Sequence, residues 1–397
     1  MFVKQWKKSV AMVFGIVIGI TVCGGGIRLA KAAQTYYVSQ STGNDANVGT
    51  SKSKAFKTLK KAVTEAEEGD AIRILDTLYQ MDSLNISKGV TIGRAADMTD
   101  YMIVLEKGAE LTLRGEVVLT GRKSSVPAQK PMIKVKEGAT LHVKGKANLK
   151  NNLSKTLPGG AVVNHGTMNI SGNCVFENNT TGSYGGGAIY NIGILNMDGG
   201  IIRNNAAGMA SVVEAEERCG GGVLNGGTFT MTGGTISQNT SIGGGGGVYS
   251  IEGSSFVFSN GIITKNKSEK RGGGVNCSGS TFTMNGGEVS YNTSIGGGGI
   301  HLGRENAGNV ISYSTISGGD IIGNKSILIS EDATVGCGGG ILVRNNSVLT
   351  ISGGVISDNV SENCGGGLRI GENGKVIING SQIISVAIAQ RRGEAYK

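Results

Sequence analysis

A glycine pair followed by a small or branched apolar residue recurs eight times along this chain, and this repeat limits the folds that it can adopt. Most copies are almost evenly spaced, and only the gaps that follow Gly186 and Gly298 are clearly longer. A unit as short as this one cannot bury an apolar face alone, so it is typical of a solenoid in which each unit packs on the next. The triplets begin at Gly159, Gly186, Gly221, Gly246, Gly273, Gly298, Gly339 and Gly366.

Three apolar columns recur in each unit, and they predict three short strands. Apolar and polar residues alternate in the second column, as in Phe229-Thr230-Met231, which indicates a strand with one buried face. The first column is Ala161, Ala188, Val223, Val248, Val275, Ile300, Ile341 and Leu368. The second is Leu195, Phe229, Phe256, Phe282 and Leu349, each two residues before Met197, Met231, Phe258, Met284 and Ile351. The third is Ile202, Ile236, Ile263, Val289, Ile321 and Ile356.

The predicted fold is all-β: a right-handed parallel β-helix, a solenoid of three sheets, over residues 71–384. Residues 33–70 are expected to hold an N-terminal strand and a short capping helix that blocks edge-to-edge association of the first rung. The helix is expected from the spacing of Phe56, Leu59, Val63 and Ala66, with Gly69 as its C-terminal cap. The apolar pattern stops after residue 384, so residues 385–397 are predicted to form an unstructured tail.

An asparagine follows the third column at a constant offset of three residues and predicts an internal ladder. Asparagine tolerates turn geometry, and stacked carboxamides can bond one another along a coil. The row is Asn205, Asn239, Asn266, Asn292, Asn324 and Asn359, and Asn178 fits the same slot after Val175. We expect these side chains to stack in single file.

Residues 1–32 have the pattern of an export signal. Three lysines precede an uncharged run over residues 10–22, and Ala30-Lys31-Ala32 forms a small-x-small cleavage site. The run is too short to span a bilayer, although an uncleaved anchor is the alternative. We therefore expect a mature chain that begins at Ala33, has no membrane span, and is secreted or displayed at the cell surface.

Charge and cysteine content narrow the function further. Without residues 1–32 the chain has 33 basic and 29 acidic side chains, a balance of +4, and no basic cluster with interleaved aromatics, so nucleic acid is not an expected partner. The five cysteines after residue 32 are scattered and predict neither a disulfide framework nor a metal site, and no cofactor is expected. Cys337 and Cys364 each precede a glycine triplet, so we expect them to stack in adjacent rungs as reduced thiols.

The N-terminal segment resembles the start of the pectate-lyase-like right-handed β-helix superfamily. The residues that carry this resemblance are Tyr36-Tyr37-Val38-Ser39, Gly43-Asn44-Asp45, Phe56-Lys57-Thr58-Leu59, Ala62-Val63 and Gly69-Asp70. The repeats resemble those of bacterial adhesin-like β-helices and of chlamydial polymorphic outer-membrane proteins, through Gly186-Gly187-Ala188-Ile189 and Phe176-Glu177-Asn178-Asn179. The resemblance covers roughly residues 35–384 and implies the fold, but the superfamily contains both enzymes and adhesins.

An enzyme of this fold, a polysaccharide lyase or a glycoside hydrolase acting on an acidic polysaccharide, would need clustered carboxylates. The best candidate pair is Glu288 and Asp320, which follow Gly-Gly pairs in consecutive rungs and are predicted to point outward. Equivalent slots in other rungs hold no acid, and the histidines His142, His165 and His301 fall on separate rungs. The sequence therefore favours a protein without catalytic activity.

Two insertions point to a binding face instead. They follow the ladder positions Asn205 and Asn324, leave from the same corner of the coil, and are acidic, which gives the candidate ligand-binding residues Glu214, Glu216, Glu217, Glu331 and Asp332. Insertions on one face of a solenoid often mark its binding face, although tolerated loop drift is the alternative. We predict an adhesin-like surface for an extracellular glycan, a cell-wall polymer or a host or cell-surface protein.

Overall fold

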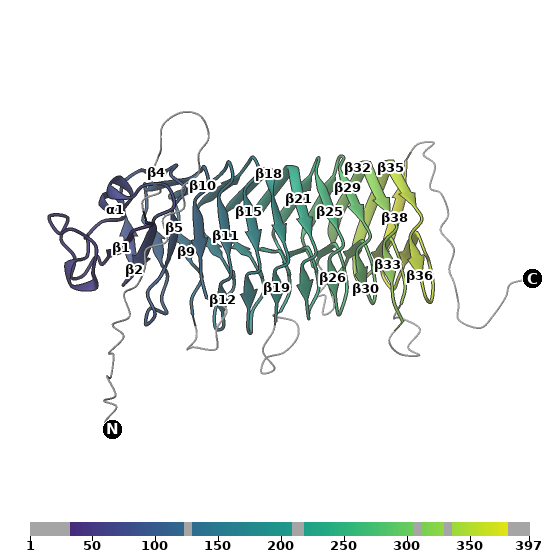
Figure 1. Cartoon of the computed structure of the whole chain (residues 1–397). Helices are drawn as coiled ribbons and strands as arrows, with labels where there is room; N and C mark the ends of the chain where they lie inside the picture. Colours follow the sequence, from purple (N-terminus) through teal and green to yellow (C-terminus); the bar gives the residue numbers. More distant parts are fainter. Residues whose placement is uncertain (1–31, 123–128, 209–217, 305–310, 329–335, 380–397) are drawn as a thin grey trace, which may run out of the picture.

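The computed structural model describes residues 32–122, 129–208, 218–304, 311–328 and 336–379. These residues form one elongated coil of stacked rungs, with the N-terminal elements at one end and β38 at the other (Figure 1). Every pairing between the described strands is parallel, and each strand bonds to its counterpart in the next rung, as β23 does with β27 and β24 with β28. A rung visits sheet B, then the two halves of sheet A, then sheet C.

The bounds of the strands follow this order. Sheet B comprises β3 (Leu78–Gln80), β6 (Ile103–Leu105), β9 (Ile133–Val135), β13 (Val162–Asn164), β17 (Ile189–Asn191), β20 (Val223–Asn225), β23 (Val248–Ser250), β27 (Val275–Cys277), β31 (Ile300–Leu302), β34 (Ile341–Val343) and β37 (Leu368–Ile370). Sheet C comprises β12 (Leu153–Ser154), β16 (Thr180–Thr181), β19 (Ala206–Ala207), β22 (Thr240–Ser241), β26 (Lys267–Ser268), β30 (Thr293–Ser294), β33 (Lys325–Ser326) and β36 (Val360–Ser361).

Sheet A is the widest sheet, because each rung gives it two strands, which fuse into one long strand in β18, β21, β32 and β35. Its members are β1 (Thr35–Val38), β2 (Ala71–Ile74), β4 (Leu84–Ile86), β5 (Thr91–Arg94), β7 (Glu110–Leu113), β8 (Val118–Thr120), β10 (Thr140–Val143), β11 (Asn148–Lys150), β14 (Thr167–Ile170), β15 (Val175–Glu177), β18 (Ile194–Arg203), β21 (Thr228–Ser237), β24 (Ser255–Phe258), β25 (Ile262–Thr264), β28 (Thr281–Met284), β29 (Glu288–Ser290), β32 (Ser312–Ile322), β35 (Ser347–Ser357) and β38 (Lys375–Ile378).

Successive parallel strands joined by short crossovers form right-handed units, and the chain is a right-handed parallel β-helix, as the glycine repeat predicts. Its core consists of inward-pointing apolar side chains that stack on their counterparts in the neighbouring rungs. The rings of Phe229 and Phe256 stack with centroids 4.7 Å apart, and Phe282 continues the row. Full burial of one such side chain stabilises the coil by about 1.5–3 kcal/mol.

The predicted first column is correct from Val223 onward but is shifted by one residue in the two earlier rungs. Val162 and Ile189 pair in register with Val223, so these two residues hold the inward position. Ala161 and Ala188 instead fill the slot that a third glycine fills in later rungs. In the sequence these alanines take the place expected for the inward apolar residue, because each alanine directly follows a glycine pair, as Val223 does in the next rung.

The predicted asparagine ladder is confirmed. From Asn205 to Asn359 each buried carboxamide donates through Nδ2 to Oδ1 of the next asparagine at 2.9–3.0 Å. The earlier member is Asn179, not Asn178, because Phe176 occupies the inward column there and Asn179 bonds to Asn205 at 3.1 Å. Asn178 turns the corner before it with a φ of 57°, a conformation that asparagine tolerates.

A second buried amide row runs inside sheet B, and the sequence pattern did not predict it. Asn164 donates to Asn191 at 2.7 Å, and Asn191 donates to Asn225 at 2.8 Å. Asn225 donates to the hydroxyl of Ser250 at 3.2 Å. In the next rung Cys277 occupies the same inward position, so the row of amides ends at Asn225. These bonds satisfy polar groups whose burial would otherwise be costly.

The N-terminal end is covered by η1 (Lys52–Lys54) and α1 (Leu59–Glu65), as the capping-helix prediction requires (Figure 1). The α1 residues Leu59, Ala62 and Val63 are buried in the core, and the Thr58 hydroxyl caps the helix by accepting from the backbone N–H of Lys61. Gly69 does not cap it. The helix ends at Glu65, and Gly69 makes a separate turn with a φ of 88° that leads into β2.

Cys337 and Cys364 stack in adjacent rungs as predicted, but the expectation of reduced thiols is wrong. They form a disulfide with a Cα–Cα distance of 4.6 Å, which lies within the range that a disulfide can bridge. Cys219 shares this corner row, but Gly244, Arg271 and Gly296, which lie between it and Cys337, have no sulfur, so the row as a whole did not suggest a pair. Among the described cysteines, Cys174, Cys219 and Cys277 are buried and are not part of this disulfide.

Candidate functional site

The structure places Glu288 and Asp320 in register on neighbouring strands, as the sequence predicted. The two residues are Cα partners in β29 and β32, and both are partly exposed on the outer face of sheet A. Their row continues on either side with the exposed apolar residues Ile262 and Val355. Neither acid lines the cavity described below, and the pair lies in a partly apolar row on the outer face of sheet A.

The five acidic residues predicted to bind a ligand, Glu214, Glu216, Glu217, Glu331 and Asp332, lie outside the described residues. The residues that flank both insertions are described. Ala207 and Ser326 occupy the same row of sheet C four rungs apart, linked through β22, β26 and β30. The two insertions therefore leave from one edge of the coil.

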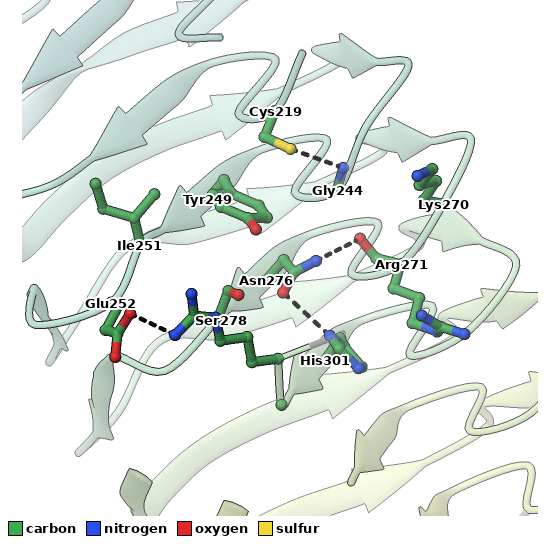
Figure 2. A pocket seen from close by; sticks show the side chains of 12 residues that line it. Cys219, Gly244, Tyr249, Ile251, Glu252, Lys270, Arg271, Asn276, Ser278 and His301 are labelled. Atoms are coloured by element: carbon green, nitrogen blue, oxygen red, sulfur yellow. Dashed lines mark hydrogen bonds and ion pairs between the residues drawn. The ribbon is translucent and has the colours of Figure 1, made fainter. Parts of the chain in front are cut away.

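A cavity of about 290 Å³ lies on the outer face of sheet B, between the two corners that border this sheet (Figure 2). Its floor is formed by Tyr249 of β23, Asn276 of β27 and His301 of β31, which are register partners in three successive rungs. The residues before and after each floor residue point inward and are buried, so these strands are anchored to the core. The floor side chains are therefore presented by a rigid part of the coil, which favours a defined binding geometry.

Close backbone approach gives the cavity its depth at one wall. A Cβ on Gly244 would lie 2.2 Å from Nδ2 of Asn276, so a larger residue there would displace the amide. The backbone N–H of Gly244 donates to Sγ of Cys219 at 3.3 Å, which ties this wall to the preceding rung. Figure 2 shows both residues above the Asn276 and His301 side chains.

The imidazole of His301 is almost fully buried, at 1% exposure, although it points outward from its strand. Its Nδ1 lies 3.0 Å from Oδ1 of Asn276, and the Asn276 amide in turn donates through Nδ2 to the carbonyl of Arg271 at 3.2 Å. Nε2 of His301 is buried and has no hydrogen-bond partner among the described residues. Burial, with smaller effects from Arg271 and Arg344, holds the pKa of His301 well below its usual range.

The described lining carries more positive than negative charge. Lys270 and Arg271 lie at one wall and Glu252 lies at the other (Figure 2). Glu252 forms an ion pair with Arg304, which also lines the cavity. With His301 neutral, these side chains sum to +2.

Two of the cavity-lining residues adjoin segments that lie outside the described residues. Cys219 follows the first acidic insertion after Arg218 and lines one wall, while Arg304 lines the other and directly precedes residues 305–310. The predicted binding side of the coil and the cavity therefore share an edge. The sequence pattern did not predict the cavity, because the residue type at this outward position changes from Tyr249 to Asn276 to His301. The one sign in the sequence was that each of these residues stands at the same distance after a glycine pair.

No group of three or more His, Cys, Asp or Glu side chains in the described ranges is placed to hold a metal ion. None of the helices in the same residues is both long and apolar enough to cross a bilayer. The disulfide is the one covalent link between rungs that the described part of the chain contains.

Comparisons with known proteins identify no family. No protein-family model matches the chain, and no curated protein matches its sequence. Among solved structures, the chain is similar to a GH136 lacto-N-biosidase from Eubacterium ramulus, with 11% identity, 89% of this chain and 68% of that chain covered, and a TM-score of 0.28.

A second similar structure is the receptor-binding protein of bacteriophage Det7, described as a podoviral tailspike in a myovirus. It is 12% identical, the match covers 91% of this chain and 78% of that chain, and the TM-score is 0.20. Similarity at this level carries no argument about function. The class of the protein, a right-handed parallel β-helix, rests on the strand pairing of the chain itself.

Proposed function

We propose that this chain is an exported, adhesin-like β-helix protein that binds a glycan in the cavity on sheet B. The observation that supports this most is the row of Tyr249, Asn276 and His301, which lines a concave site on strands fixed by the core. Concave sites with a few well-placed polar groups are the usual binding sites of proteins. Tyrosine supplies an apolar ring face with a polar end, and the amide and imidazole supply hydrogen bonds that suit sugar hydroxyls.

Binding is favoured over cleavage because of where the carboxylates lie. A glycoside hydrolase uses two carboxyl groups that flank the scissile bond. Glu252 is the one carboxylate among the described lining residues, and it is already paired with Arg304. Glu288 and Asp320 lie on sheet A, away from the cavity lining.

Export is supported by two independent features. Residues 1–32 have the composition of a signal peptide, and the Cys337–Cys364 disulfide suits an oxidising compartment outside the cytoplasm. A secreted or surface-displayed location would bring the cavity into contact with extracellular glycans or cell-wall polymers.

The test is binding of purified residues 33–397 to an array of glycans and cell-wall fragments, with the hits repeated in solution by calorimetry. We expect at least one glycan to bind, and Tyr249→Ala and Asn276→Ala to weaken binding tenfold or more. Thr283→Ala, on the outer face of sheet A, is the matched control and should bind normally. Absence of glycan binding, or equal binding by all variants, would refute the proposal.

A further inference from the structure

We infer that the cavity is one end of a longer binding surface, and that its ligand is an extended, β-linked oligosaccharide that continues from the cavity along the coil axis to Tyr190. This inference rests on the proposed glycan-binding function and specifies the ligand class of the same site. Two observations carry it: the outward column of sheet B is buried on one side of the cavity, and it is apolar and partly exposed on the other.

The outward column is closed on the side of the cavity that faces the C-terminal end of the coil. After His301 the next residue in this column is Leu342, which is only 3% exposed. A Cβ on Gly296 would lie 3.1 Å from Cδ2 of Leu342, so the backbone of the neighbouring corner lies against the leucine side chain. A ligand that fills the cavity therefore finds no accessible side chain in the next rung of this column.

The column is open on the opposite side of the cavity. Tyr249, which belongs to the cavity floor, is the register partner of Leu224, and Leu224 is the register partner of Tyr190. All three side chains point outward and are partly exposed. None of them carries a charge, and together they form an apolar strip that leads from the cavity through two further rungs.

Two isoleucines border this strip at the corner that leads to sheet A. Ile192 directly follows β17, Ile251 directly follows β23, and Gly226 takes the same position in the rung between them. A Cβ on Gly226 would lie 2.9 Å from Cδ1 of Ile251 and 3.2 Å from Cγ2 of Ile192, so the two side chains converge on the glycine. Ile251 also lines the cavity (Figure 2), which makes the apolar surface continuous with it. The strip and the two isoleucines form the sheet B platform, which consists of Tyr190, Ile192, Leu224, Tyr249 and Ile251.

The sheet B platform suits the faces of sugar rings in an extended chain. In a pyranose with equatorial substituents the hydroxyls lie at the edge of the ring, so both faces present C–H groups that can pack on an aromatic side chain. Tyr190 and Tyr249 are two strand spacings apart, about 9.6 Å along the coil axis. In an equatorially β-linked chain each ring advances by about one strand spacing, so alternate rings can lie on the two tyrosines. An α-linked chain curls and cannot follow a straight strip.

The length of the ligand follows from the rungs that it covers. The cavity, at about 290 Å³, lies at the lower end of the range for small-molecule sites and suits one sugar residue. Beyond that ring the platform offers one position on each of Tyr249, Leu224 and Tyr190. At one ring per strand spacing, we expect about four sugar residues to contact the protein, and any further residues to extend into solvent.

The experiment compares chains of different length and linkage by calorimetry against residues 33–397. The probes are the dimers, tetramers and hexamers of cello-oligosaccharides and chito-oligosaccharides, which are β-linked, and of malto-oligosaccharides, which are α-linked. In at least one β-linked series we expect the tetramer to bind at least tenfold more tightly than the dimer, and the hexamer to match the tetramer. The α-linked series should show no such gain.

Variants of the platform test its contribution. Tyr190→Ala should abolish the gain from dimer to tetramer and leave the dimer affinity unchanged, because Tyr190 lies outside the cavity lining. Tyr190→Phe keeps the ring and should keep the gain. Ile192→Ser should also reduce the gain, and it carries the test if Tyr190→Ala fails to fold, because Ile192 is already 38% exposed. Tyr79→Ala is the matched control, since Tyr79 stands exposed in the same outward column four rungs before Tyr190. This control should change neither affinity.

The outcomes separate this inference from the proposed function. Equal affinity of dimer and tetramer in every series, or a gain that survives both Tyr190→Ala and Ile192→Ser, overturns the extended site while glycan binding stands. A gain of the same size or larger in the α-linked series overturns the assignment of the linkage. If no probe binds, the inference falls, and the glycan array decides whether the proposed function falls with it.

Discussion

The Arg94 guanidinium donates a hydrogen bond through Nη1 to Oδ1 of Asn152, which precedes Asn179 in the ladder row and donates through its backbone N–H to Oδ1 of Asn179 at 3.2 Å. Along the ladder each Oδ1 accepts from the asparagine on its N-terminal side, so all carboxamide oxygens face the N-terminal end of the coil. Arg94 therefore places a positive charge at the negative end of an aligned row of dipoles. It also donates through Nη2 to the carbonyls of Lys130 and Pro131.

Replacement of this arginine should destabilise the fold strongly. Arg94→Met removes the donor to Oδ1 of Asn152 and the donors to the carbonyls of Asp100, Lys130 and Pro131, of which Lys130 keeps a second donor in Asn152. We expect the free energy of unfolding to fall by about 3 kcal/mol. Arg114→Met is the control, because Arg114 is exposed on the same end of the coil. Urea unfolding followed by circular dichroism measures both. Equal stability of the two variants would show that the ladder does not depend on Arg94.

The inward-facing parts of the fold could be predicted from the sequence, because the core imposes the same residue type on every rung. The columns around Ile236 and Phe256 and the row around Asn266 repeat for this reason. The sequence pattern assigned Asn178 to the ladder in place of Asn179, because two asparagines are adjacent at that corner. A shift of one residue along a strand moves a side chain from one face of the sheet to the other.

The cavity could not be predicted in the same way. Outward residues such as Tyr249 and His301 are not constrained by the core, so they vary and show no column. The burial of His301 depends on how the flanking corners approach sheet B, which follows from three-dimensional packing. The disulfide is a related case, since the repeat brings Cys337 and Cys364 together but does not determine their oxidation.

Loss of the disulfide should reduce stability without unfolding the coil. The bond spans 27 residues, and the chain-entropy model gives a contribution of about 3–4 kcal/mol for a loop of that length. The double variant Cys337→Ser, Cys364→Ser should show this loss in urea unfolding. Thiol titration of unreduced, unfolded residues 33–397 should count Cys174, Cys219 and Cys277 and no others. Five reactive thiols would show that the bond does not form in solution.

His301 should make the stability of the fold depend on acid pH. Burial holds its pKa in the folded state well below 6.5, so below that pH the unfolded chain binds a proton that the folded chain does not. Stability is therefore unaffected by this group above pH 6.5 and falls as the pH drops further, by up to about 1.4 kcal/mol per pH unit.

The variant His301→Gln isolates this effect. Unfolding free energies of both proteins, measured from pH 7.5 to pH 5, should run parallel above pH 6.5, and the parent should lose stability relative to the variant below it. His165→Gln serves as the comparison, since burial and Lys134 also lower the pKa of His165, but that residue is less buried and should give a smaller change. Parallel curves over the whole range for His301→Gln would show that the imidazole is accessible to protons.

The acid pair on sheet A distinguishes a binding protein from an enzyme. If the chain is adhesin-like, Glu288→Gln combined with Asp320→Asn should leave glycan binding unchanged, since neither residue lines the cavity. Incubation of the parent with acidic polysaccharides should release no new reducing ends or unsaturated products. Depolymerisation by the parent that the double variant lacks would establish a polysaccharide lyase or hydrolase instead.

Removal of the first acidic insertion tests whether the predicted binding face and the cavity work together. Gly208 and Arg218 lie side by side, as a Cβ on Gly208 would be 2.6 Å from that of Arg218, so two glycines can replace residues 209–217 without opening the coil. The rungs on either side keep their cores, and we expect the midpoint of thermal unfolding to change by less than about 4 °C.

If the predicted binding face contributes to recognition, glycan affinity should fall at least fivefold in the same variant, because Cys219, which lines the cavity, lies two residues after the replaced segment. The control is a matched replacement of residues 123–128, because their described neighbours Arg122 and Gln129 lie several rungs before the cavity; this replacement should leave affinity unchanged. If the deletion of residues 209–217 retains full affinity, the insertion is tolerated loop drift, and recognition resides in the strand-borne side chains alone. Lower affinity together with a lost unfolding transition would instead assign the segment a structural role in the coil.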